Sequence, residues 1–211
     1  MSDYLVLDAV SKALRTILWD AFNADGVIRP IVGSEAAIVF SNPTDTARDS
    51  SNRLSLWLYQ ITENEHVKNQ PMLRSPVVPL PPPPPGARAP RLVAQYPPMA
   101  LNLYFLATPF AQSDEADHLL LGKTMQVLYD NAIIFLEDAA SDIFEELRVI
   151  FCRLSLEELT RIWESLREPY RLSVCYLIRV TRIDSKRRPE SGLVVERSAG
   201  FSSDPSAVAA T

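Results

Sequence analysis

The sequence contains little glycine, cysteine or histidine, and these shortages exclude several classes of protein. Among its 211 residues are six glycines, two cysteines and two histidines. Six glycines leave little room for the glycine-rich phosphate-binding patterns of nucleotide enzymes, and the sequence contains none of them. The cysteines and histidines do not follow zinc-ligand spacing. We interpret Cys152 and Cys175, each inside an expected strand, as buried, reduced thiols.

Long hydrophobic runs and an excess of basic charge are also absent. The apolar stretch Leu101–Leu106 is much shorter than the ~20 residues that cross a bilayer, so we expect no membrane contact. The N-terminus lacks the basic start and apolar centre of a signal peptide, which makes a cytoplasmic location the expectation. The formal net charge of −5 argues against a dedicated nucleic-acid binder.

No pattern in the sequence indicates catalysis. The nucleophile elbow Gly-x-Ser-x-Gly and the zinc helix His-Glu-x-x-His do not occur. The acidic pair Glu157–Glu158 is explained by helix capping, because Ser155 stands three residues before Glu158. His66 and His118 are interpreted as surface or capping residues. We therefore expect a protein that is not an enzyme and that uses no cofactor and no metal.

Proline is the residue that the sequence has in excess. Of its 17 prolines, 11 fall between Pro71 and Pro98, and five of these form the unbroken run Pro81–Pro85. Strand-like apolar segments flank this stretch, Arg53–Ile61 before it and Met99–Ala107 after it. Because proline fixes φ and lacks a backbone donor, we expect a long polyproline loop projecting from within a sheet. Loops of this length are usually functional or disordered.

Three interpretations of this proline-rich loop remain open. It could be a ligand for SH3 or WW domains, with Arg74, Arg88 and Arg91 nearby to support binding. It could instead be an arm that lies against a neighbouring subunit of an assembly. It could also be a tolerated insertion without a function.

The remaining patterns predict an α+β domain over residues 1–184, followed by a flexible C-terminal tail over residues 185–211. We expect a mixed, largely antiparallel sheet of about five strands with three helices packed against it and the proline-rich loop 71–98 within it. The expected strands are residues 36–40, 53–61, 99–107, 147–151 and 170–183, and the expected helices are residues 3–22, 113–131 and 155–168.

Hydrophobic spacing also predicts which side chains are buried. The second strand, residues 53–61, is apolar on both faces, which predicts a central strand covered on both sides. Gly122 lies inside the second expected helix, where glycine is unfavourable, so we expect another element to pack closely there. The buried stripes of the first and third helices are predicted to be Val6, Val10, Ala13, Ile17 and Ala21, and Leu156, Leu159, Trp163 and Leu166.

Basic residues gather where the last expected strand ends. They are Arg179, Arg182, Lys186, Arg187 and Arg188. One interpretation is a strand end whose charge prevents edge-to-edge aggregation. The other is an electrostatic contact with an acidic partner. Together with Arg74, Arg88 and Arg91, these residues are the candidates for partner contact.

Five segments of the sequence form a recognisable series. They are Asn52–Ile61 with Asn64 and Asn69 after it, Pro97–Ala111, Leu120–Asn131, Leu154–Trp163 and Pro169–Tyr176. In this order they resemble the tail-terminator or cap proteins of extracellular contractile injection systems, which are phage-tail-like particles. No single segment is specific, but five in this order and spacing are considerably more persuasive.

The resemblance implies a structural subunit that forms a hexameric ring at the distal end of an inner tube and contractile sheath. Such a ring would stop tube growth and anchor the last sheath ring, so its partners would be itself, the tube and the sheath. An exposed sheet edge could accept an extended sheath segment by strand addition, and the long strand 170–183 is the expected site. The alternatives are a neck or baseplate component of a similar particle, or a cytosolic adaptor that binds through its prolines.

Overall fold

The computed structural model describes residues 4–48, 51–67, 73–76, 92–137, 144–185 and 190–191. The chain divides into two compact units. The first comprises Met1–Gln70 and Pro98–Asp184, and the second comprises Pro71–Pro97 and Ser185–Thr211.

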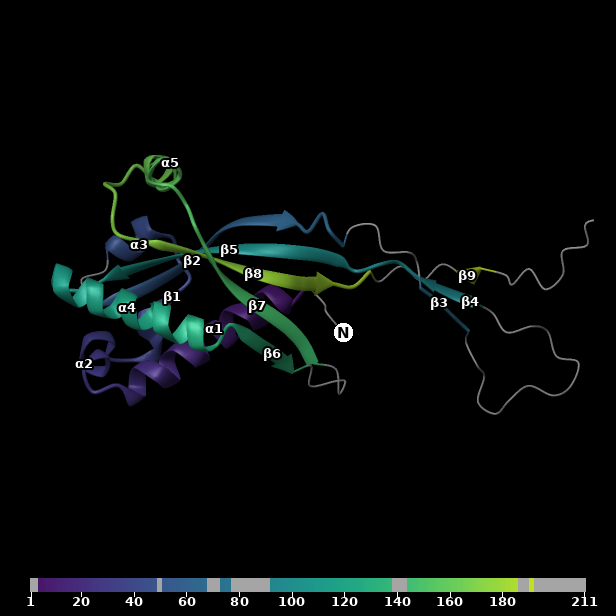
Figure 1. Cartoon of the computed structure of the whole chain (residues 1–211), viewed down its shortest axis with the longest axis horizontal. Coiled ribbons are helices and arrows are strands. Elements are labelled where there is room, and N and C mark those ends of the chain that lie inside the picture. Colours follow the sequence, from purple (N-terminus) through teal and green to yellow (C-terminus); the bar gives the residue numbers. More distant parts are fainter. Residues whose placement is uncertain are drawn as a thin grey trace, which may run out of the picture. The chain divides into compact units, whose positions relative to one another are not determined.

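The first unit is built around a six-stranded sheet with the order β1-β2-β5-β8-β7-β6. Only β1 and β2 run parallel among the paired strands, and every other pair is antiparallel. The mixed, largely antiparallel α+β fold is therefore confirmed, with one strand more than expected (Figure 1). The strands are β1 (Ile38–Val39), β2 (Arg53–Glu63), β5 (Met99–Phe110), β6 (Ile133–Glu137), β7 (Phe144–Cys152) and β8 (Val174–Ile183).

Five α-helices accompany this sheet in the described residues, where the sequence predicted three. The three long ones are α1 (Val6–Ala24), α4 (Asp114–Asp130) and α5 (Leu156–Leu166). The short ones are α2 (Ile28–Val32) and α3 (Pro43–Ala47), and a 3-10 turn covers Glu35–Ala37. The Asn42 side chain caps α3 by accepting from the Asp45 amide, and Pro43 occupies the first helical turn, where its lack of a donor costs nothing.

The main core lies between one face of the sheet and the helices α1 and α4. The side chains that α1 buries follow a spacing of four, and they are Val6, Val10, Leu14, Leu18 and Phe22. The predicted stripe is therefore correct for its first two members, Val6 and Val10. Its other members, Ala13, Ile17 and Ala21, lie beside the buried side chains and are only half-buried. From the sheet, Leu54, Leu103 and Leu147 enter the same core and are fully buried.

The second strand is central, as predicted, but its two faces are covered unequally. On the core face Leu54 and Leu56 are buried, whereas Trp57 and Tyr59 on the other face are half-buried. The pairing with β5 shifts between Leu58 and Gln60, so Tyr59 is an extra residue in the ladder. Because of this extra residue, the Ile61 side chain lies on the same face of the sheet as its partner Leu103. Strict alternation along the strand would have placed Ile61 on the face of Trp57.

A buried asparagine ends β2. Asn64 is 2% exposed, and its amide nitrogen donates to the Ala100 carbonyl at 2.8 Å. Its side-chain Nδ2 donates to Asn102 Oδ1 at 3.2 Å, while its Oδ1 accepts from the His66 amide at 3.1 Å. These bonds satisfy a buried polar side chain and fix the direction in which the chain leaves β2.

The last long strand, β8, lies inside the sheet. It pairs with β5 over most of its length and with β7 from Cys175 to Arg179. A strand paired on both sides offers little free edge, so the prediction that residues 170–183 accept an added strand was wrong. The free edges of the six-stranded sheet belong to β1 and β6.

The second unit contains a small sheet with the order β3-β4-β9. The strands β3 (Leu73–Pro76) and β4 (Leu92–Gln95) form an antiparallel hairpin from the two ends of the proline-rich segment, which was predicted to be a loop throughout. The tail contributes β9 (Glu190–Ser191), which pairs with β4. The proline run 81–85 lies outside the described residues, as does the tail beyond residue 191.

The helix α5 has the predicted N-terminus but a different buried face. The Ser155 hydroxyl accepts from the Glu158 amide at 3.2 Å, and the Glu158 carboxylate accepts from the Ser155 amide at 2.8 Å. This reciprocal pair is the predicted capping box. Trp163 is the buried residue of the helix, whereas Leu156, which the stripe placed inside, is 67% exposed.

Gly122 offers a direct test of the packing in α4. A Cβ atom added there meets nothing within 4 Å, so the close packing expected at this glycine is not present. We expect Gly122→Ala to raise the free energy of unfolding by about 1 kcal/mol, because alanine loses less backbone entropy in a helix. Chemical denaturation measures the change.

Gly33 serves as the matched control for Gly122. It follows α2 with φ +75°, a conformation that favours glycine. Gly33→Ala should therefore destabilise the chain, although the space around its Cβ position is equally open. Equal effects of the two substitutions would contradict this account of α4.

Candidate assembly surfaces

Among the described residues, neither a metal site nor a membrane-spanning helix is found. These residues contain no group of three or more histidine, cysteine or acidic residues placed to hold a metal ion. His66 and His118 are both exposed. None of the described helices combines the length and the apolar character that crossing a membrane requires.

The two cysteines lie next to each other on the sheet face opposite the main core. Cys152 in β7 and Cys175 in β8 are directly paired, and both are free thiols. The Tyr59 hydroxyl lies 3.2 Å from Cys175 Sγ. Burial is the main cause that raises the pKa of Cys152 and Tyr59, and it raises the pKa of Cys175 to about 12. Since the thiolate is the reactive form, the Cys175 thiol is a packing group and not a nucleophile at neutral pH.

The raised pKa of these thiols makes the stability of the folded chain vary with pH in the alkaline range. Because the pKa of Cys175 is higher in the folded chain than in the unfolded chain, folding holds the proton more tightly. The contribution of this thiol to stability is therefore fully present below its pKa in the unfolded chain, about 8.5, and is lost as the pH rises toward 12. One such proton contributes a slope of at most about 1.4 kcal/mol per pH unit.

Chemical denaturation between about pH 8 and pH 10 measures this slope. We expect the free energy of unfolding to fall across this range in the unaltered chain. In Cys175→Ala the fall should be shallower, because one of the titrating groups has been removed. An identical slope in the two proteins would contradict the assignment to this thiol.

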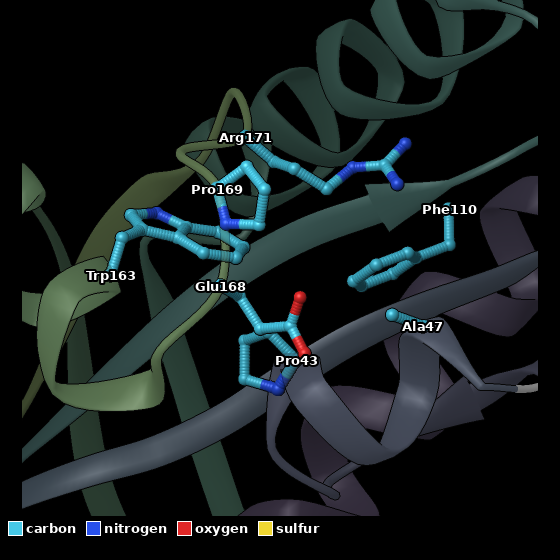
Figure 2. A pocket seen from close by; sticks show the side chains of 7 residues that line it. All are labelled: Pro43, Ala47, Phe110, Trp163, Glu168, Pro169 and Arg171. Atoms are coloured by element: carbon cyan, nitrogen blue, oxygen red, sulfur yellow. The ribbon is translucent and has the colours of Figure 1, made fainter.

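A pocket of about 220 Å³ lies where α3, the end of β5 and the segment between α5 and β8 meet. Figure 2 shows Trp163 and Pro169 on one side of this pocket and Phe110 and Ala47 on the other. Its volume is below that of drug-sized ligand sites, and suits one inserted side chain better than a small molecule. The lining residues are Pro43, Ala47, Phe110, Trp163, Glu168, Pro169 and Arg171.

Ordered contacts hold the walls of this pocket. Trp163 is 2% exposed, and its Nε1 donates to the Ser173 hydroxyl at 3.2 Å. The Arg171 guanidinium lies 4.7 Å from the centre of the Phe110 ring and donates to Asp117 Oδ2 at 3.1 Å. The other Asp117 oxygen accepts from the Ala111 amide at 2.6 Å. Asp117 and Arg171 thus tie α4, the end of β5 and the approach to β8 together.

Sequence reasoning did not identify this pocket. Trp163 was predicted only as a buried residue of the third helix, and no role in a pocket was predicted for Phe110, Pro169 or Arg171. The pocket residues come from three segments that are far apart in the sequence. No local spacing pattern connects such segments, so only the fold reveals the pocket.

The predicted contact residues are distributed over both units. Arg179 is half-buried in β8 directly opposite Arg148, and Arg182 is exposed. Like charges that face each other across strands are unfavourable, but Arg148 has a carboxylate partner in Glu146 at 3.0 Å. Arg74 lies in β3, whereas residues 88, 91 and 186–188 lie outside the described residues. Partner contact through these basic residues remains a prediction.

The fold is that of the terminators of contractile injection systems. The sheath/tube terminator of the extracellular contractile injection system PVC in its extended state matches with a TM-score of 0.63 at 21% identity, over 95% of this chain. The tube-terminating cap of the anti-feeding prophage matches with a TM-score of 0.60 at 19% identity, over 91% of this chain.

The chain belongs to the family described as the Pvc16 N-terminal domain, which matches residues 9–197. The resemblance inferred from the five sequence segments is thereby confirmed. The matches cover 64% of the PVC terminator chain and 60% of the anti-feeding prophage cap, so this chain aligns with less than two thirds of either protein. A comparison with curated protein sequences gives no significant match.

Proposed function

We propose that the chain is a structural subunit that caps a contractile injection particle. In this role, six copies form a ring that ends the inner tube and anchors the last sheath ring. The observation that carries the proposal is the extent of the fold match, which covers at least 91% of this chain in terminators from two different particles. Membership in the Pvc16 N-terminal domain family supports the same role.

The architecture suits a ring subunit. A head-to-tail interface uses two different surfaces of each copy, and it makes a ring when the rotation closes. The six-stranded sheet with its packed helices is a rigid body that can hold two such surfaces in a fixed relation. The second unit, with its hairpin of β3 and β4, adds a further surface on which a tube or sheath subunit could bind.

The proposal places the chain in the cytoplasm during assembly and in the finished particle afterwards. The two solved relatives are components of such particles, one of them described as extracellular. The role needs no catalytic group, cofactor or metal. The raised pKa of the Cys175 thiol, about 12, agrees with a packing role for that residue.

Binding of the purified chain to isolated tubes tests the proposed role. Negative-stain microscopy should show a ring on the tube end that lies away from the baseplate. Attachment at the baseplate end would favour a neck or baseplate component instead. A chain that binds neither end and forms no ring would contradict the proposal.

Deletion of residues 76–90 distinguishes the proposed cap from the alternative function, an adaptor that binds through its prolines. A cap lacking these residues should still form rings on tubes, because the six-stranded sheet is left intact. An adaptor would lose all binding together with its polyproline ligand.

A further inference from the structure

The strand β6 presents an open sheet edge. It is the outermost strand of the six, paired only with β7 among the described residues (Figure 1). The Val149 amide donates to the Ala132 carbonyl at 2.9 Å, which fixes the pattern of the ladder. Because backbone groups alternate between the two sides of a strand, the N–H and C=O groups of Ile133, Phe135 and Glu137 point to the open side.

In the part of the chain that the structure describes, this edge carries no lysine or proline and no further strand covers it. Proteins commonly protect an edge with lysine, proline or a covering segment. The sequence Ile-Ile-Phe-Leu-Glu of β6 contains neither lysine nor proline, and Ile133 and Phe135 are 49% and 60% exposed. An unprotected edge with exposed apolar side chains indicates a surface that a partner strand covers.

Charge indicates what kind of strand this edge accepts. On β7, Glu145 and Glu146 stand opposite Leu136 and Phe135 of β6, while Arg148, opposite Ile133, is paired with Glu146 at 3.0 Å. The first unit as a whole carries 23 acidic and 14 basic residues, whereas the second carries three acidic and seven basic. The chain is therefore a strongly acidic body joined to a basic unit, and electrostatic complementarity favours contact between the two in different copies.

We propose that the β6 edge binds residues 192–197 of a second copy as an added strand, while β9 (Glu190–Ser191) of that copy stays paired with its own β4. The basic residues Lys186, Arg187 and Arg188 precede β9, and the β-forming run Leu193-Val194-Val195 follows it. The basic residues match the carboxylates of Glu145 and Glu146 beside β6, and the apolar run can cover Ile133 and Phe135. The inference rests on the proposed ring, because it supplies the head-to-tail contact that closes one.

Cross-linking identifies the segment that occupies the edge. Phe135 is replaced by benzoylphenylalanine in the full chain, and the protein is mixed with an isotope-labelled copy, in solution and on isolated tubes. We expect photo-cross-links from position 135 to residues 192–197, joining labelled to unlabelled copies. Cross-links confined to one copy, cross-links only to sheath or tube subunits, or no cross-link in either preparation would each overturn the proposal.

A substitution series measures the contribution of the edge. We expect Phe135→Lys to weaken self-association at least about tenfold, as loss of a buried apolar anchor does at interfaces. Tyr129→Lys on α4 is the matched control, because Tyr129 is 83% exposed and lies outside the sheet, and it should change association less than about twofold. Val194→Asp, in the segment itself, should weaken association as Phe135→Lys does. Equal association in all four proteins would overturn the proposal.

The outcomes separate this contact from the proposed function. If Phe135→Lys still forms rings that bind tube ends, the contact is wrong and the cap stands. If the chain cross-links to its neighbour as predicted but never binds tubes, the contact stands and the cap is wrong. Thermal unfolding of each variant should show that Phe135→Lys remains folded, because Phe135 is exposed.

Discussion

Replacement of Trp163 by alanine should lower the free energy of unfolding by about 3–5 kcal/mol, as expected for removing a fully packed tryptophan. Trp163 is 2% exposed, donates to Ser173 and packs edge-to-face against Tyr170 with ring centroids 6.4 Å apart. The substitution leaves a cavity and removes a donor from the Ser173 hydroxyl. It also removes one wall of the pocket in Figure 2.

Leu156→Ala on the same helix is the control for Trp163→Ala. Leu156 is 67% exposed, so its substitution should change stability by less than about 0.5 kcal/mol. Urea denaturation followed by circular dichroism measures both changes. A loss of less than about 1 kcal/mol for Trp163→Ala would show that α5 is not fastened to the sheet in this way.

The substitution Leu103→Ala should also destabilise the chain by about 3–5 kcal/mol. Leu103 is fully buried in β5, at the centre of the sheet, and it pairs with Ile61 in β2 and Ile178 in β8. The surrounding ladders prevent the sheet from closing on the cavity that alanine leaves. The loss of stability therefore lies in the range found when a buried leucine is replaced by alanine and the surrounding structure does not relax into the cavity.

Two further substitutions make the Leu103 result specific. Leu103→Met conserves volume and should cost less than about 1.5 kcal/mol. Leu119→Ala, at a side chain that is 49% exposed on α4, should have little effect. If Leu119→Ala cost as much as Leu103→Ala, the assignment of the core to the inner face of this sheet would be wrong.

The sequence predicted the strands and caps whose signals are local. The segments predicted as the strands β2, β5 and β8 and the capping box at Ser155 each depend on neighbouring residues. The displaced stripe of α1 has a different origin. Two sets of apolar residues lie side by side on that helix, and the sheet, which is distant in sequence, determines that Leu14, Leu18 and Phe22 are the deeper set.

The candidate surfaces could not be predicted because they depend on strand order. The strand 170–183 was expected to be an edge from its length and regularity, yet β5 and β7 flank it. The actual edge, β6, is a five-residue strand that is not among the strands predicted from the sequence. The contrast in charge between the two units was also missed, because the basic residues of the second unit lie in two segments separated by more than 80 residues.

The length distribution of particles made without this chain tests the proposed cap most directly. Particles from a strain lacking the chain are measured by negative-stain microscopy beside particles from the parent strain and from a strain in which the chain is restored. The cap predicts tubes of uncontrolled length without the chain and the parental length when it is restored. Tubes with the parental length distribution in its absence would contradict the account.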